Sequence, residues 1–201
     1  MASYSSYDVR QADWRKSVYV NDVDLFVITG ARASVCDADP WMMVLEDFVR
    51  DVWWTQAKML GICFGHQIVA KAMGGRVARH HSGWNAGVVA YQWQGPPAWL
   101  RNGSEGIRLL AIHQDQVIEV SKAGRVVAGN ERCLNGIVLY GDRFLTIQAH
   151  PEHTPGFTKA LISRRVPVGT AVCGGTGSVD VADSGDARSL SEPVWKWLTH
   201  D

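Results

Sequence analysis

Residues 58–77 read K-M-L-G-I-C-F-G-H-Q-I-V-A-K-A-M-G-G-R-V. The apolar run Met59–Ile62 is followed by a glycine-flanked cysteine in Gly61–Gly65, and then by apolar residues at helical spacing. This order predicts a buried strand, a sharp turn and a helix, which is the context of a nucleophile elbow. Glycines on both sides of the turn lack a Cβ, so the backbone can bend tightly there.

Cys63 is predicted to lie at this turn, at the N-terminus of the helix. The unpaired N–H groups and the macrodipole at that end of a helix favour a thiolate, the form of cysteine that attacks a carbonyl carbon. An isolated G-x-C-x-G is equally compatible with a small, buried, unreactive cysteine beside a tight turn. The rest of the chain must therefore supply a base.

Length and composition bound the class of protein. With 201 residues the chain is long enough for a single domain, 1–201, with a hydrophobic core. Its formal net charge of zero gives no argument for nucleic acid or an anionic membrane as partner. No apolar run reaches membrane-spanning length, and the N-terminus does not resemble a signal peptide. The four cysteines show no pairing pattern, so we expect a cytoplasmic protein with reduced thiols, and we predict no cofactor and no metal.

The chain upstream of the elbow predicts the start of an α/β sheet. Asp24–Gly30 is a buried strand that ends in glycine, and Asp39 and Pro40 begin a helix with apolar residues at helical spacing. Strand, helix, strand and helix in this order are typical of a parallel sheet covered on both faces.

Further strands and two short helices follow Gly75. The strands are expected as one or two antiparallel strands in Val77–Trp93, then Ile107–Gln116, Val126–Cys133, Leu134–Tyr140 and, after a hairpin turn, Phe144–Gln148. The helices are expected over Phe157–Arg165 and Glu192–Leu198, and Val168–Ser189 is expected to be a long loop or poorly ordered.

His150 is the best-placed base. It is predicted at the C-terminal end of a strand, where open α/β sheets place their ligand sites. Pro151 prevents the chain from continuing as a helix, and Glu152 can turn back to accept the His150 ring N–H. On its own the pair also suits an ordinary surface contact, but an elbow cysteine in the same chain favours catalysis.

Four motifs in this order resemble the class I (triad) glutamine amidotransferases, and more closely the stand-alone γ-glutamyl peptidases and fungal amidotransferase-like proteins. The motifs are Gly61–Gln67, Gly74–Val77, His113–Val117 and Gln148–Glu152. The resemblance covers roughly Asp24–Phe157. It implies a flavodoxin-like α/β fold: a mostly parallel sheet with helices on both faces and an antiparallel hairpin region.

The resemblance also implies a Cys–His–Glu triad, carried here by Cys63, His150 and Glu152. Such a triad hydrolyses a γ-glutamyl amide of a small-molecule substrate through a γ-glutamyl thioester on the cysteine. The backbone N–H of Phe64 and that of the loop after Gly30 are expected to form the oxyanion hole.

Other residues match substrate-side positions of the family. Gln67 matches a position that helps to hold the glutamyl group, although a polar residue on the first helical turn is an equally good interpretation. His113, Gln114 and Asp115 match a segment near the site rim and are expected to be structural or to contact substrate. Packing roles are favoured for His66 and Trp84.

The chain departs from the family at both ends. Residues 1–23 hold no apolar run of five, so the first βα unit of the family is missing and the strand Asp24–Gly30 is expected to be exposed at an edge. Either Tyr4–Val9 or Ser17–Val20 covers that edge as a short strand, or a partner or second copy does. Residues 166–201 are expected to form an irregular extension.

Three functional hypotheses follow. The chain is a hydrolase of γ-glutamyl amides such as glutamine, γ-glutamyl peptides or glutathione conjugates; or a glutaminase that delivers ammonia to a separate synthetase with which it associates; or an inactive truncated homologue that binds a partner.

Overall fold

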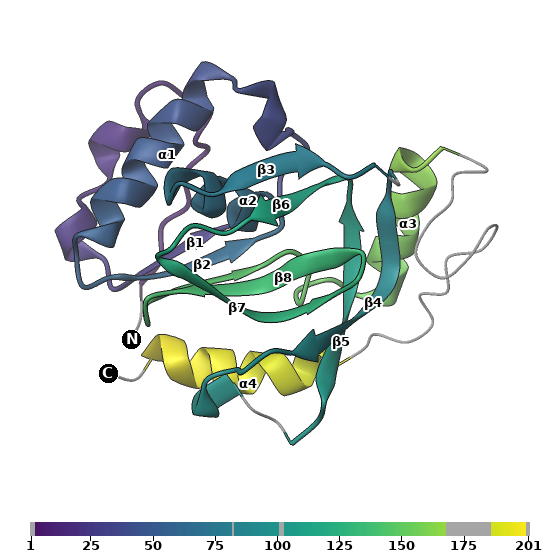
Figure 1. Cartoon of the computed structure of the whole chain (residues 1–201). Helices are drawn as coiled ribbons and strands as arrows, with labels where there is room; N and C mark the ends of the chain where they lie inside the picture. The colour runs from purple at the N-terminus through teal and green to yellow at the C-terminus, as the bar shows by residue number, and fades with distance from the viewer. Residues whose placement is uncertain (1–2, 82, 101–102, 168–185, 200–201) are drawn as a thin grey trace.

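The computed structural model describes residues 3–81, 83–100, 103–167 and 186–199. Seven strands form one sheet in the order β1-β2-β9-β8-β7-β4-β5, and β3 and β6 form a separate two-stranded sheet (Figure 1). The strands of the large sheet are β1 (Leu25–Ile28), β2 (Lys58–Ile62), β4 (Asn85–Trp93), β5 (Gly106–His113), β7 (Gly124–Asn130), β8 (Cys133–Tyr140) and β9 (Phe144–Ile147). The other elements are β3 (Arg76–Arg79), β6 (Asp115–Glu119), α1 (Pro40–Trp53), α2 (Phe64–Ala72), α3 (Pro155–Arg165) and α4 (Ala187–Thr199).

The parallel part of the sheet is the part that carries the elbow. β2 pairs in parallel with β1 on one side and with β9 on the other. The remaining pairs, β9–β8, β8–β7, β7–β4 and β4–β5, are antiparallel, so the antiparallel region is larger than a single hairpin.

Helices cover both faces of the sheet, as predicted (Figure 1). On one face α1 begins with Pro40 at its first position and buries an apolar stripe formed by Leu45, Phe48, Val49 and Val52. Beside it α2 is buried along most of its length. On the other face α4 buries Leu190 and Val194, and the Trp197 ring stacks on Trp99 with centroids 5.2 Å apart. The predicted terminal helix is therefore confirmed and is longer than expected.

The strand β1 lies at the edge of the seven-stranded sheet, as expected from the sequence. The proposed cover by a strand from Tyr4–Val9 or Ser17–Val20 is wrong, because among residues 3–24 the structure describes only turns and two short 3₁₀ helices, Trp14–Ser17 and Val20–Asp22. Val27 of β1 is half exposed. Pairing of this edge with a partner or a second copy stays a prediction.

The expected single strand Ile107–Gln116 is two strands. β5 ends at His113 and pairs with β4, whereas β6 begins at Asp115 and pairs with β3 in the small sheet. The chain therefore passes from the large sheet to the small one at Gln114: the residues before it pair with β4, and the residues after it pair with β3. At this break the Asp115 carbonyl accepts a hydrogen bond from Gln67 of α2, the helix that follows the elbow.

Most of the expected loop Val168–Ser189, residues 168–185, lies outside the described residues. The last residues of that range, from 187 on, belong to α4.

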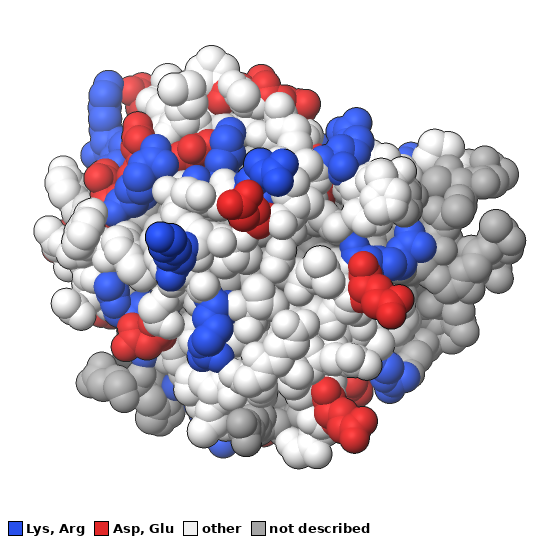
Figure 2. All heavy atoms as spheres, viewed as in Figure 1, with Lys and Arg blue, Asp and Glu red and all other residues white. Residues whose placement is uncertain are grey.

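Of the helices in the described ranges, none combines the length and the apolar character that crossing a membrane requires. On the face shown in Figure 2, acidic and basic side chains lie interspersed rather than gathered in a patch of one sign.

Candidate active site

Cys63 occupies the turn between β2 and α2 in a conformation that is rare for a residue with a side chain, with φ 52° and ψ −99°. Such backbone strain costs about 1–3 kcal/mol and is typical of functional turns. The glycines around it are needed for space. A Cβ on Gly61 would lie 2.7 Å from the Gly65 carbonyl oxygen, and a Cβ on Gly65 would lie 2.1 Å from that of Ile28. The predicted elbow is therefore present.

His150 and Glu152 lie beside this cysteine. The Nδ1 atom of His150 is 2.7 Å from Oε1 of Glu152, and the Cys63 side chain hydrogen-bonds to the same imidazole. The His150 backbone N–H donates to the Leu110 carbonyl at 2.7 Å, which ties the residue to β5. Because Glu152 occupies Nδ1, Nε2 of His150 is the nitrogen left for the sulfur.

The charges of this group favour a cationic imidazole. Burial by itself would lower the pKa of His150, but the hydrogen bonds to Cys63 and Glu152 outweigh it and raise the pKa to about 9. For Glu152, burial by itself would raise the pKa, but the hydrogen bond to His150 outweighs it, so the pKa of Glu152 is lowered. An imidazolium between a carboxylate and a sulfur is the arrangement that stabilises a thiolate.

Gly30 lies directly over the pair. A Cβ built on this residue would be 2.8 Å from Cε1 of His150 and 3.6 Å from Cβ of Cys63. The loop that follows Gly30 thus borders the Cys63 and His150 side chains. Phe64 is the first residue of α2, so its N–H is one of the first-turn groups that have no partner within the helix.

The loop after Gly30 is anchored by Asp115. The Ser34 hydroxyl donates to one carboxylate oxygen of Asp115, and Nε of Arg79 donates to the other at 3.2 Å. The side chain of Asp115 is only 8% exposed. These contacts give Asp115 a structural role, since both of its oxygens are already bonded within the protein.

Gln67 and His113 form a buried polar network behind the elbow. Nε2 of Gln67 donates to the Asp115 carbonyl at 2.7 Å and to Oε1 of Gln148 at 3.1 Å. Nδ1 of His113 lies 3.1 Å from the same Asp115 carbonyl, and burial lowers the pKa of His113 to about 4. These contacts tie Gln67, His113 and Gln148 to the Asp115 backbone, whereas Nε2 of His113 and Nε2 of Gln148 are buried without a hydrogen-bond partner among the described residues.

The remaining residues singled out from the sequence lie outside the reacting group. His66 is fully buried, its Nδ1 lies 2.8 Å from the Thr146 hydroxyl, and burial lowers its pKa to about 3. Trp84 packs against a small apolar cluster, and Gln114 accepts the His80 backbone N–H at 2.8 Å. The packing roles predicted for His66 and Trp84 are confirmed.

His153 belongs to the site and was not predicted from the sequence. Its ring stacks face to face on that of His150, with centroids 3.9 Å apart and planes 4° apart. The only signal in the sequence is a histidine directly after Glu152, which by itself indicates nothing about stacking.

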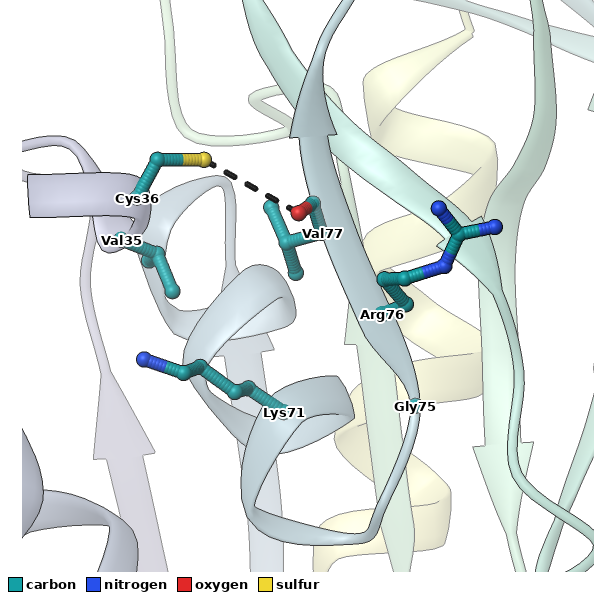
Figure 3. Close-up of a pocket in the computed structure, with 6 residues that line it drawn as sticks. All are labelled: Val35, Cys36, Lys71, Gly75, Arg76 and Val77. Atoms are coloured by element: carbon teal, nitrogen blue, oxygen red, sulfur yellow. Dashed lines mark hydrogen bonds between the residues drawn. The ribbon is translucent and has the colours of Figure 1, made fainter. Parts of the chain in front are cut away.

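A surface hollow of about 290 Å³ lies elsewhere, at the far end of α2 from Cys63 (Figure 3). Its two cations point away from each other, and each is paired: Lys71 with Glu46 at 3.1 Å and Arg76 with Glu119 at 3.3 Å. The hollow therefore presents no convergent charge to a ligand.

Comparison with known proteins shows the family of this chain. Residues 10–166 match the family described as glutamine amidotransferase class-I, so the chain belongs to the class I glutamine amidotransferases. Among its relatives, a glutamine amidotransferase-like protein of Schizosaccharomyces pombe is 32% identical over 145 residues, covering 70% of this chain and 57% of the relative. Gamma-glutamyl peptidase 4 of Arabidopsis thaliana is 27% identical over 166 residues, covering 80% of this chain and 66% of the relative. The chain thus spans less than two thirds of the length of these relatives.

Solved structures confirm the fold class. A glutamine amidotransferase of Methylobacillus flagellatus matches with a TM-score of 0.73 at 22% identity, over 90% of this chain and 75% of that one. A glutamine amidotransferase of Thermotoga maritima matches with a TM-score of 0.61, also at 22% identity, over 70% of this chain and 61% of that one. The α/β, flavodoxin-like architecture predicted from the sequence is the architecture of this family.

Proposed function

We propose that this chain hydrolyses γ-glutamyl amides of small molecules, with Cys63 as nucleophile, His150 as acid and base, and Glu152 as the group that orients the imidazole. The observation that carries the proposal is a cysteine on a strained elbow that hydrogen-bonds to a histidine held by a carboxylate at 2.7 Å. A nucleophile, its base and a third orienting group are the parts that covalent acyl transfer requires.

In the proposed reaction, the Cys63 thiolate attacks the δ-carbonyl carbon of the γ-glutamyl group, and the carbonyl oxygen becomes an oxyanion. The His150 imidazolium gives its proton to the departing nitrogen as the carbon–nitrogen bond breaks, which leaves a γ-glutamyl thioester and a free amine. Neutral His150 then takes a proton from water as the water attacks the thioester. Glutamate leaves, and the thiolate and imidazolium are restored.

The oxyanion would accept hydrogen bonds from the Phe64 N–H and from an N–H of the loop after Gly30. The first lies at the start of α2, where the helix dipole adds positive potential. The second depends on the position of the loop, which Ser34 and Asp115 hold in place. Gln67, His113, Gln114 and Asp115 support the pocket in this proposal and do not carry the chemistry.

The leaving group separates two versions of the proposal. Several relatives are named gamma-glutamyl peptidases, including gamma-glutamyl peptidases 2 and 4 of Arabidopsis thaliana, which favours an amino acid or peptide as the leaving amine. A more distant relative, 26% identical, is named as one of the subunits of a glutamine-hydrolyzing GMP synthase in Sulfolobus acidocaldarius, which favours ammonia delivered to a separate synthetase. The assembled Cys63–His150–Glu152 group argues against an inactive homologue.

A substrate panel tests the proposal. Glutamine, γ-glutamyl peptides and a glutathione S-conjugate are incubated with the protein and with Cys63→Ala, and glutamate, ammonia and the free amine are each measured. We expect glutamate release in the wild-type protein and a loss of about 10⁴-fold or more in the variant, because a triad acts as a unit. Turnover of Cys63→Ala within tenfold of wild type would remove Cys63 from the mechanism.

A further inference from the structure

His153 is enclosed by the reacting group on one side and by α3 on the other. One face of its ring lies on His150, and the Phe157 ring meets it nearly edge-on with centroids 4.8 Å apart. Its Nδ1 lies 3.3 Å from the hydroxyl of the buried Thr158, and its Nε2 lies 3.8 Å from Oε1 of Glu152. Only 8% of the side chain is exposed.

We propose that His153 is a positioning residue for the reaction: its ring, fixed by α3, holds the plane of the His150 imidazole so that one edge faces Glu152 and the other faces Cys63. This inference rests on the proposed function. Glu152 alone orients the imidazole incompletely, because its side chain is 45% exposed and makes one short contact with the ring. A single hydrogen bond fixes one edge of a ring but not its tilt, whereas a flat surface 3.9 Å away blocks the tilt.

The charges around His153 suit this role. Burial, the positive charge of His150 and that of Arg165 from α3 together lower the pKa of His153 to about 4, against the opposing effect of Glu152. His153 is therefore neutral at neutral pH. A neutral aromatic face carries partial negative charge and is attracted to a cationic ring. Protonation of His153 would instead place two positive rings face to face.

The same residues do not form a metal site in this geometry, although donor atoms of His150, Glu152 and His153 lie within 4.8 Å of one another. An imidazole nitrogen binds a metal along a direction in the plane of its ring. Two rings stacked with planes 4° apart do not aim their lone pairs at one ion. The arrangement is that of a stack and not of a chelate.

Two substitutions separate stacking from mere occupancy of space. His153→Phe keeps a flat ring against His150, and His153→Ala removes it. The matched control is His81→Ala, because the His81 ring also lies against a neighbouring histidine, His80, with centroids 4.3 Å apart and planes tilted by 36°. Each variant is assayed for alkylation of Cys63 by iodoacetamide at about pH 6.5, near the ordinary pKa of histidine, with the label located by peptide mass spectrometry. The kcat and KM for γ-glutamyl hydrolysis and the melting temperature are also measured.

We expect His153→Ala to slow Cys63 alkylation about tenfold and to lower kcat by about 10–100-fold while KM changes by less than about twofold, since a misplaced acid–base group affects the chemical step. His153→Phe should recover at least about a third of wild-type alkylation and kcat, and His81→Ala should leave both within about twofold.

The inference is overturned if His153→Ala alkylates and turns over like wild type, or if Phe and Ala at this position are equally impaired. Alkylation needs no substrate, so this arm decides the role of His153 even if no γ-glutamyl compound is hydrolysed. Absence of hydrolysis in the wild-type protein would count against the proposed function alone.

Discussion

Gly30→Ala is expected to remove activity while leaving the fold intact. The added methyl carbon would lie 2.8 Å from Cε1 of His150, whereas carbon atoms in contact are normally about 3.5–4.0 Å apart. The imidazole or the loop must therefore move by about 1 Å. A displacement of that size at reacting groups costs about 10²-fold in rate, or about 2.7 kcal/mol of barrier. The backbone of Gly30 does not have a positive φ, so alanine is tolerated there conformationally.

The assay is the rate of glutamate release from the best γ-glutamyl substrate, measured together with the melting temperature. Two other glycines provide matched controls. Gly156→Ala places a methyl group in open space in the first turn of α3 and should change neither rate nor stability adversely. Gly65→Ala would place its Cβ 2.1 Å from the Ile28 carbonyl oxygen and should destabilise the fold itself. A Gly30→Ala variant that retains a third of wild-type activity would refute the placement of this loop over His150.

The remaining predictions concern the same group of side chains. Glu152→Gln should lower kcat less than His150→Ala, because Glu152 orients the imidazole and His150 moves the proton; the reverse order in parallel kinetics would identify another base. Amide hydrolysis should fall above about pH 9, where His150 loses the proton that the leaving amine needs, whereas alkylation of Cys63 should not; a rate that holds to higher pH would contradict the raised pKa. Denaturant unfolding should show lower stability at acid pH, because burial lowers the pKa of His66 to about 3 and of His113 to about 4. Their folded-state pKa values lie below the unfolded ones, so the stabilisation that these neutral histidines contribute is complete above about pH 6.5 and is lost as pH falls. The free energy of unfolding should drop by roughly 2 kcal/mol per histidine at about pH 5. Equal stability at about pH 7 and 5 would contradict this expectation.

The elbow could be predicted from the sequence because its determinants are local. The glycines at 61 and 65, the apolar strand before them and the apolar helix after them specify a sharp turn without reference to distant residues. The pairing of Cys63 with His150 follows less directly from the sequence, since 86 residues of the chain lie between them. It depends on the order of the motifs and on the rule that ligand sites lie at the carboxyl ends of parallel strands.

Other features depend on tertiary contacts that no local pattern encodes. The break at Gln114 arises because β4 and β3 belong to different sheets. The committed hydrogen bonds of Gln67 and Asp115 are known only once Ser34, Arg79 and the rest of the network are in place. The His153 stack likewise depends on α3, which supplies Phe157 beside the His153 ring and packs through Ile162 against Leu110 and Ile112 of β5.

Labelling with a glutamine-like chloroketone tests the central claim most directly, because the reagent requires both a glutamyl pocket and a reactive thiol. The protein is incubated with the reagent, digested and analysed by mass spectrometry, with and without excess glutamine. We predict a single modification at Cys63, slowed by glutamine and abolished in Cys63→Ala. Modification of the exposed Cys36 instead, or no modification of Cys63 in the folded protein, would contradict the account.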